Sequence, residues 1–500
     1  MSIKTELLEE PKLQFGSYFE HEDCKTGLAA YGPFGKSVAG LHPSEIKLGF
    51  IGTGETVSDG KEWIEECAQP IESENVKRSS SRSDSTDTLP GVDMSDPQGD
   101  QLEKILDRDF VGFSRESPFA CCFQTNERWD RVINHREVQR ILDVPNKEQR
   151  IWQLVVRFEE ELKSLATTSP SPDIVIVALT PAMVDLAHAV KLSDSSWLNF
   201  RRAIKACAMK WGVPIQLLKH RTVTGQGADL QDKATRAWNF CTAQYYKKEG
   251  VPWRPITLQP KTCYVGVSFY TAGDEDANVT VRSSVAQAFD YLGQGLVLRG
   301  DPFVWDKEQF GRSPHLTKAA ARKLVQDVLK EYVRVIHTPP SRIVVHKTSK
   351  FWGAEHGDYN ELEGFYEGID SVFAGCESDL LALKQTGVYL FREGRYPPVR
   401  GTYFCVEGQG HFLYTMGFVP YLQTYPGSYV PEPWQIIDHH GGSSPKDLFR
   451  EVLALTKMNV NNCSFADGSP ITLSFSRKIG EIMKHVPVGE TVQPKLKFYM

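Results

Sequence analysis

Residues 262–270 read Thr-Cys-Tyr-Val-Gly-Val-Ser-Phe-Tyr, a stretch in which β-branched and aromatic side chains dominate. Such a stretch predicts a β-strand. The residues after it predict, in order, strands at 278–288 and 295–300, a helix at 316–336, a strand at 342–346, and helices near 445–458 and 474–485. Three strands, a helix and then a strand are the opening order of the RNase H-like fold, which the later elements would complete.

The residues before this unit alternate between strand and helix patterns. A strand from Ile46 runs into the glycine turn Gly52-Thr-Gly54, and the Ser/Asp/Gly/Pro-rich stretch 73–100 is predicted as a flexible insertion. The elements predicted next are a helix at 146–166, a strand at 173–180, a basic helix at 197–211, a strand at 214–218 and a helix at 233–249. Such alternation is typical of a parallel α/β sheet covered by helices on both faces.

The composition is that of a globular protein. The chain has 500 residues, of which 41% are apolar and 24% charged, which excludes a wholly disordered or collagen-like chain. At roughly 150 residues per domain, two or three domains are expected. No run approaches the ~20 apolar residues of a membrane helix, and the acidic start differs from a signal peptide. The ten cysteines form no C-x-x-C pair. We therefore expect a cytoplasmic protein with free thiols.

The net charge of −6 conceals a segregation of charge along the chain. Residues 1–110 hold 11 basic and 22 acidic residues, whereas residues 195–261 hold 12 basic and 3 acidic residues. The last stretch, 475–500, is again basic. A local surplus of positive charge indicates either an anion-binding site or a solvated charged face.

Two motifs suggest chemistry that their context does not support. Gly52-Thr-Gly54 resembles the start of a dinucleotide fingerprint, but the third glycine position is held by Val57 and a polar insertion follows. An NAD-binding oxidoreductase is therefore the weaker alternative. Asp438-His439-His440 contains metal-ligand residue types without a partner at ligand spacing. A polar loop before the helix at Pro445 is the favoured interpretation.

The RNase H-like prediction makes a specific demand on the strands. Two-metal nucleases of this fold hold their ions with carboxylates on the first strand and at the end of the fourth. Neither predicted strand contains an acidic residue, and Lys347 would repel a metal. Asp274 and Asp276 follow the first strand in a predicted loop. The sequence therefore predicts an inactive nuclease, and an active one using these loop acids is the alternative.

A basic helix and its neighbours form the stronger candidate site. Arg201 and Lys205 are four residues apart and share a helix face. Gln216 lies on the next strand, and Asn239 and Lys247 lie on the next helix. Cations and amides that converge at strand ends could bind a terminal phosphate. Alternatively, Arg201 and Lys205 are simply solvated.

Several blocks, in order, resemble the prokaryotic Argonautes. Residues 200–218 and 239–254 are similar to their MID domain. The segments similar to their PIWI domain are Tyr264–Ser268, Ile343–Thr348, Tyr414–Tyr421 and Leu453–Asn459. The opening Leu8–Pro11 with Tyr31–Phe34 resembles short prokaryotic Argonautes in particular. This resemblance implies an N-terminal segment at 1–45, a Rossmann-like MID domain at 46–255 and an RNase H-like PIWI domain at 256–500.

The resemblance also assigns roles to individual residues. It implies that Lys205, Gln216 and Lys247 bind the 5′-phosphate of a guide strand, with Asn239 supporting the pocket. Arg201 stands where the family usually has Tyr or His, so the 5′-base preference is open. The carboxylate of Met500 would share a Mg²⁺ ion with the guide phosphate. Ser268 and Thr348 stand where active members carry Asp, which implies that the chain itself is not an enzyme.

Short Argonautes act with a partner, and the resemblance implies one here. The partner would carry an APAZ region fused to an effector, most commonly a sirtuin-like or TIR NAD hydrolase and less often a nuclease. The implied function is guide-RNA-directed recognition of invading single-stranded DNA, which activates the effector in prokaryotic defence against plasmids and phages by abortive infection. The complex could form a higher oligomer on activation, and no membrane association is expected.

Overall fold

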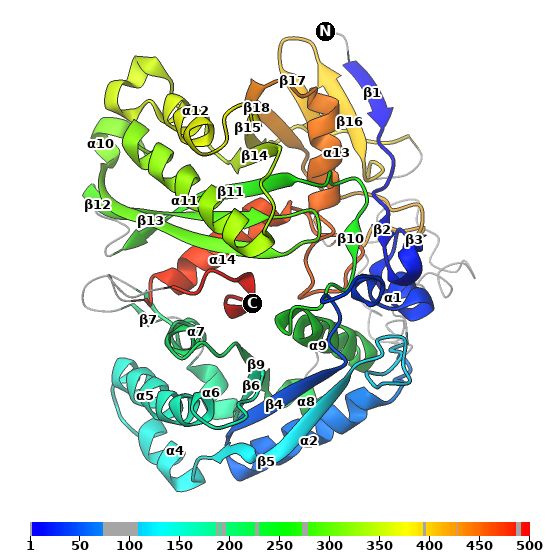
Figure 1. The fold of residues 1–500 in the computed structure, drawn as a ribbon, viewed down its shortest axis with the longest axis vertical. Helices are drawn as coiled ribbons and strands as arrows, with labels where there is room; N and C mark the ends of the chain where they lie inside the picture. Colours follow the sequence, from blue (N-terminus) through cyan, green and yellow to red (C-terminus); the bar gives the residue numbers. More distant parts are fainter. Residues whose placement is uncertain are drawn as a thin grey trace, which may run out of the picture.

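The computed structural model describes residues 3–73, 109–186, 190–191, 197–225, 230–272, 279–393, 397–427, 429–486 and 492–500. These residues form two lobes, each built on its own β-sheet (Figure 1). Almost all of the predicted insertion at 73–100 lies outside the described residues.

The first lobe is built on a four-stranded sheet in the order β5–β4–β6–β9, and all three strand pairs are parallel. The predicted parallel α/β sheet is thus confirmed. The strands are β4 (Glu45–Gly52), β5 (Cys122–Val132), β6 (Ile174–Leu179) and β9 (Ile215–Lys219), with a small pair β7 (Val190–Lys191) and β8 (Trp197–Leu198). The helices are α2 (Gly54–Ala68), α4 (His135–Leu142), α5 (Lys147–Ala166), α6 (Pro181–Asp185), α7 (Phe200–Lys210), α8 (His220–Thr224) and α9 (Lys233–Lys247).

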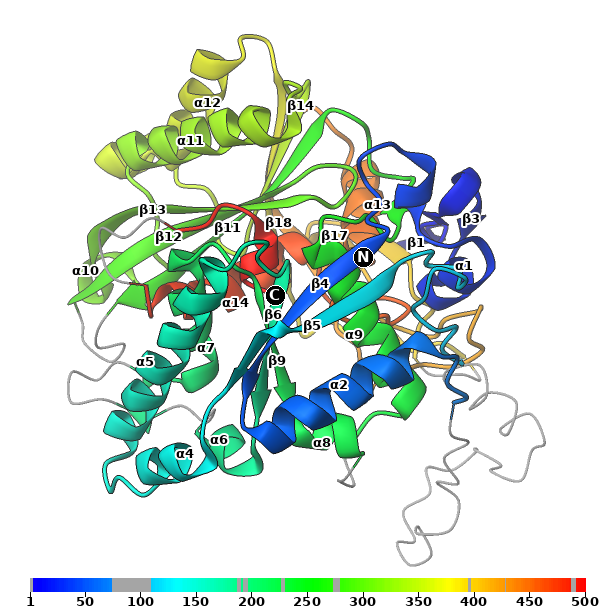
Figure 2. The same cartoon turned by 60° about the horizontal axis from the view of Figure 1, so that its bottom comes forward.

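Alternate residues of the central strand β6 explain why helices cover both faces. Ile174 and Ile176 pack into one core with α2 and α9, while Val175 and Val177 pack into another with α5 and α7. Figure 2 shows α2 and α9 on one side of this sheet and α5 and α7 on the other. A strand buried on both faces requires a continuous apolar run, which Ile174–Leu179 provides.

The second lobe is built on a nine-stranded sheet in the order β1–β16–β17–β18–β15–β14–β11–β12–β13. The predicted order of three strands, a helix and a strand is confirmed, and β14 lies parallel to β11. Its elements are β11 (Thr262–Ala272), β12 (Val279–Phe289), β13 (Gly295–Asp306), α10 (Lys307–Phe310), α11 (Lys318–Ile336), β14 (Arg342–Lys347), α12 (Glu361–Val372), β15 (Glu377–Gln385), β16 (Thr402–Val406), β17 (Gly410–Leu413), β18 (Trp434–Gly441), α13 (Pro445–Leu455) and α14 (Ile471–Met483).

The N-terminal segment links the two lobes. Strand β1 (Ile3–Leu7) joins the rim of the nine-stranded sheet by pairing with β16. The short strands β2 (Leu13–Gln14) and β3 (Glu20–His21) form a small sheet with β10 (Arg254–Pro255), followed by α1 (Cys24–Tyr31). The N-terminal segment therefore contributes strands to two sheets of the folded protein.

The last residues of the chain lie between the lobes. Tyr499 and Met500 belong to a core that also contains residues of the first lobe, such as Phe50, and of the second, such as Phe475. Figure 1 shows the C-terminal end close to α7, α9 and α14. No helix within the described part of the chain is long and apolar enough to cross a membrane.

Candidate anion-binding site between the lobes

Helix α7 provides two cations that point to the same region. Asn199 caps the helix by accepting a hydrogen bond from the N–H of Arg202. Arg201 lies in the first turn and is exposed, whereas Lys205, one turn later, is only 4% exposed. The apolar positions Ala203, Ile204 and Ala208 bury the helix against the core, and this fixes the direction of Lys205.

Lys205 reaches the end of the chain. Its Nζ donates to the main-chain oxygen of Met500, and it lies 3.4 Å from the oxygen of Tyr499. Burial lowers the pKa of Lys205 well below its usual range, and the positive charges of Arg201, Lys247 and Lys478 lower it further. The lysine is thus held in a place where its charged form is disfavoured.

Lys247 enters the same region from α9. Its Nζ donates to Gln216 Oε1 at 2.6 Å and to the main-chain oxygen of Ile215 at 3.0 Å. Gln216 Oε1 also accepts a hydrogen bond from Gln244 Nε2 at 3.3 Å. Burial, followed by repulsion from Arg201, lowers the pKa of Lys247 to about 7.

Among the described residues, no acidic side chain neutralises the positive charge of this site. Neighbouring Arg202 pairs with Glu481 at 2.5 Å. In contrast, no described acidic side chain forms an ion pair with Arg201, Lys205 or Lys247. Lys478 on α14, which was not predicted from the sequence, adds a further positive charge near Lys205. Cations that converge without acidic side chains favour the binding of an anion.

Asn239 does not belong to this group. Its Nδ2 donates to Gln231 Oε1 at 3.1 Å, and its Oδ1 accepts from the N–H of Cys463 at 2.8 Å. It precedes Lys247 by eight residues, about 12 Å along the helix axis at ~1.5 Å per residue. Asn239 therefore joins α9 to the second lobe rather than reaching Lys205.

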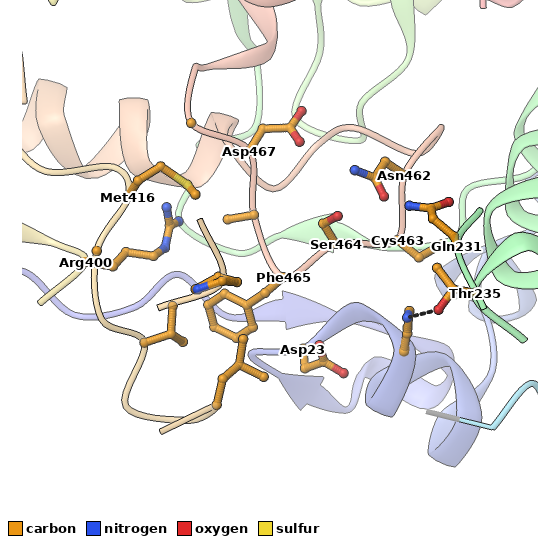
Figure 3. A pocket seen from close by; sticks show the side chains of 17 residues that line it. Asp23, Gln231, Thr235, Arg400, Met416, Asn462, Cys463, Ser464, Phe465 and Asp467 are labelled. Atoms are coloured by element: carbon orange, nitrogen blue, oxygen red, sulfur yellow. Dashed lines mark hydrogen bonds between the residues drawn. The ribbon is translucent and has the colours of Figure 1, made fainter. Parts of the chain in front are cut away.

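A cavity of about 380 Å³ lies beside this contact, between α1, the start of α9 and the segments around 416–426 and 462–468 (Figure 3). Lys25 Nζ donates across it to Thr235 Oγ1 at 3.3 Å. Arg400 lines it as well, but Asp23 and Asp467 bring negative charge. Burial raises the pKa of Asp467. The cavity is thus polar and of mixed charge, unlike the site at Lys205 and Lys247.

The two positions that the resemblance assigns to lost carboxylates lie at the same level, with Ser268 in β11 and Thr348 directly after the end of β14. Gly266 of β11 is paired with His346 of β14, so the parallel register carries Ser268 to the level of Thr348. Ser268 is half-buried and Thr348 is exposed. Asp274 and Asp276, the acids of the alternative active nuclease, lie outside the described residues.

A buried acid that contacts Lys347, the residue before Thr348, is already occupied. Glu361 is fully buried and accepts hydrogen bonds from Lys347, from His315 Nδ1 at 2.8 Å and from the N–H of Trp352 at 3.1 Å. Across the described ranges, no group of three or more His, Cys, Asp and Glu side chains is arranged to hold a metal ion.

The two other motifs have structural roles. Thr53 caps α2, and a Cβ on Gly52 would lie 2.5 Å from Thr56 Oγ1 and 2.8 Å from the oxygen of Ala178. Gly52 therefore allows close packing of strand and helix. The prediction of a loop at His439 and His440 is wrong, because both lie within strand β18. Their pairing with β15 places His439 Nε2 3.0 Å from Asp379 Oδ1.

The residues around Lys205 do not by themselves fit Mg²⁺. The oxygens of Met500 and Gln216 already accept hydrogen bonds from lysine ammonium groups. Mg²⁺ is usually bound by one or two carboxylates together with phosphate oxygens. Coordination here would therefore depend on a ligand's phosphate, and the Mg²⁺ site stays a prediction.

Solved structures that match this fold include two Argonautes. Clostridium butyricum Argonaute, bound to a guide DNA with a 5′ deoxycytidine and to a 19-mer target DNA, matches with a TM-score of 0.63 and 14% identity, covering 100% of this chain and 55% of that one. Aa-Ago with externally bound siRNA matches with a TM-score of 0.56 and 14% identity, covering 99% of this chain and 56% of that one. No protein-family model and no protein of curated function matches the sequence. The chain therefore has an Argonaute fold and spans about half the length of these Argonautes.

Proposed function

We propose that this chain binds the 5′-phosphorylated end of a guide RNA and uses the guide to recognise single-stranded DNA. Residues 46–255 act as the MID domain and residues 256–500 as the PIWI domain. The guide phosphate lies against Arg201, Lys205 and Lys247, while Gln216 orients Lys247. The Argonaute fold supports this proposal, as does the guide bound to the Clostridium butyricum protein.

The observation that carries the proposal is the burial of two lysines without acidic side-chain partners among the described residues. Lys205 and Lys247 are 4% and 1% exposed. Burying an ammonium group costs several kcal/mol unless an opposite charge compensates it. A terminal phosphate carries close to two negative charges at pH 7. It can therefore offset the cost of both lysines at once.

The test compares guide RNAs that differ only at the 5′ end. Wild-type protein is expected to bind a 5′-phosphate guide at least tenfold more tightly than a 5′-hydroxyl guide. Lys247→Gln should remove most of this difference and reduce the slope of affinity against salt by about one charge. Filter binding at several salt concentrations measures both quantities.

Lys210→Ala is the matched control. Lys210 lies on α7 like Lys205, but it is exposed and pairs with Glu159 at 3.1 Å. The control variant should retain the wild-type preference for the phosphate. Equal affinity of wild-type protein for both guides would refute the proposal.

We further propose that the chain binds its target without cutting it. Ser268 and Thr348 provide no carboxylate at the level where paired strand acids would hold two metals. Binding then has a consequence only if another protein responds to it. That protein is proposed to be an APAZ-containing subunit with a sirtuin-like or TIR NAD hydrolase, acting in defence by abortive infection.

A further inference from the structure

Within the described part of the chain, strand β1 leaves one edge of the nine-stranded sheet uncovered. It is the outermost strand, paired only with β16 among the described strands, and all five of its side chains are exposed. Ile3 and Leu7 are 48% and 56% exposed. Figure 1 shows the strand at the rim of the second lobe. An open edge with apolar side chains is a template for pairing with another strand.

The direction of the free backbone groups follows from one hydrogen bond. The N–H of Leu8 donates to the main-chain oxygen of Gly401 at 2.9 Å. The N–H and C=O groups of Leu8 therefore point towards β16. In an antiparallel pair this direction alternates from residue to residue. Ile3, Thr5 and Leu7 therefore direct their N–H and C=O groups away from the sheet, where a further strand could pair with them.

The sequence of β1, Ile-Lys-Thr-Glu-Leu, is complementary to itself. When two copies lie antiparallel about Thr5, Ile3 of each copy stands opposite Leu7 of the other. Lys4 then stands opposite Glu6 in both directions. Ile3, Thr5 and Leu7, whose N–H and C=O groups point outward, would form the hydrogen-bonded pairs of the new ladder. Lys4 and Glu6 would form the non-hydrogen-bonded pairs, in which opposite side chains come closest.

We propose that two copies of the chain associate through β1 and join their nine-stranded sheets into one continuous sheet. The contact is isologous, because the same strand serves both copies. Lys4 forms no ion pair within the described part of its own chain, and Glu6 contacts Lys446 of α13. Five residue pairs bury far less than a standard interface. The dimer is therefore weak, and its population depends on protein concentration. The proposal of a dimer is independent of the proposed guide binding.

Charge exchange tests the register. Analytical ultracentrifugation of the untagged full-length chain should show an average mass rising from 56.3 kDa towards twice that value with concentration. Lys4→Glu alone places Glu opposite Glu, and Glu6→Lys alone places Lys opposite Lys, so each variant should remain monomeric. An equimolar mixture of the two restores opposite charges at both pairs and should dimerise.

Lys12→Glu makes the same charge change at an exposed lysine outside β1 and should dimerise like the wild type. Circular dichroism checks that each variant is folded. A wild-type chain that stays monomeric up to its solubility limit would overturn the proposal. A mixture of Lys4→Glu and Glu6→Lys that stays monomeric while the wild type dimerises would overturn the proposed register and interface.

Discussion

Lys247 is a buried lysine whose ammonium group is held by Gln216 and the main-chain oxygen of Ile215. Its pKa is lowered to about 7, compared with ~10.4 for a free lysine. Above pH 7 the unbound protein therefore has a largely neutral Lys247. A bound phosphate favours the charged form and raises this pKa, so binding takes up a proton between pH 7 and the pKa of the complex.

The affinity for a 5′-phosphate guide should therefore fall as the pH rises from 7 to 9. One linked proton gives a decrease that approaches tenfold per pH unit. The phosphate itself stays a dianion over this range, because its second pKa is about 6. Fluorescence anisotropy with a labelled guide measures the profile. Lys247→Gln should lower the slope and leave the part due to Lys205, whose pKa is lowered as well, and an unchanged slope in that variant would assign the proton to another group.

At the scale of single elements, Gly266 on β11 shows how closely the last helix packs on the sheet. A Cβ at this position would overlap the main-chain oxygen of Thr472 on α14. Since that oxygen belongs to the backbone, α14 would have to shift as a whole. We expect Gly266→Ala to destabilise the protein by about 1–3 kcal/mol.

Denaturant unfolding of Gly266→Ala, measured beside Gly442→Ala, checks this contact. A Cβ on Gly442 meets no atom within 4 Å, so the control variant should unfold like the wild type. If both variants unfold at the same denaturant concentration, α14 is not packed against β11 in this way.

The elements that the sequence predicted well have strong local patterns. Ile174–Leu179 is a continuous apolar run, and β11, α11 and β14 follow one another in the expected order. Helix α2 was not predicted, because Gly52 and Gly54 at its start favour a turn. Its signal was present in Thr53 as a cap and in the buried Val57 and Ile64 at helical spacing.

Long-range pairing could not be predicted from local patterns. Nothing near Ile3 indicates that it pairs with Val406, and Asn239 shares a helix with Lys247 while contacting the other lobe. The polar and glycine residues around His439 and His440 favour a loop, yet both lie in strand β18, where His439 Nε2 is 3.0 Å from Asp379 Oδ1 on β15. In each of these cases the position of the residue depends on a partner that is distant in the sequence.

At the scale of the whole molecule, the anion site lies between the lobes, whereas Ser268 and Thr348 belong to the second lobe. Lys205 of the first lobe contacts Met500, which packs in a core shared with the second. A guide held at Lys205 and paired with DNA forms a stiff duplex whose fit depends on how the lobes and any partner are arranged. A duplex that fits one arrangement better shifts the population towards it.

We therefore expect an effector subunit that is nearly silent with guide RNA alone and becomes active when matched DNA pairs with the guide. The measurement follows NAD over time in the co-purified complex, with matched or scrambled single-stranded DNA that carries an end label. Matched DNA should cause NAD loss while the labelled strand stays intact, as the proposal of binding without cutting requires of a chain with no carboxylate at Ser268 or Thr348. Equal NAD loss with both DNAs would contradict recognition by pairing, and cutting at one fixed position would show that the chain is a nuclease.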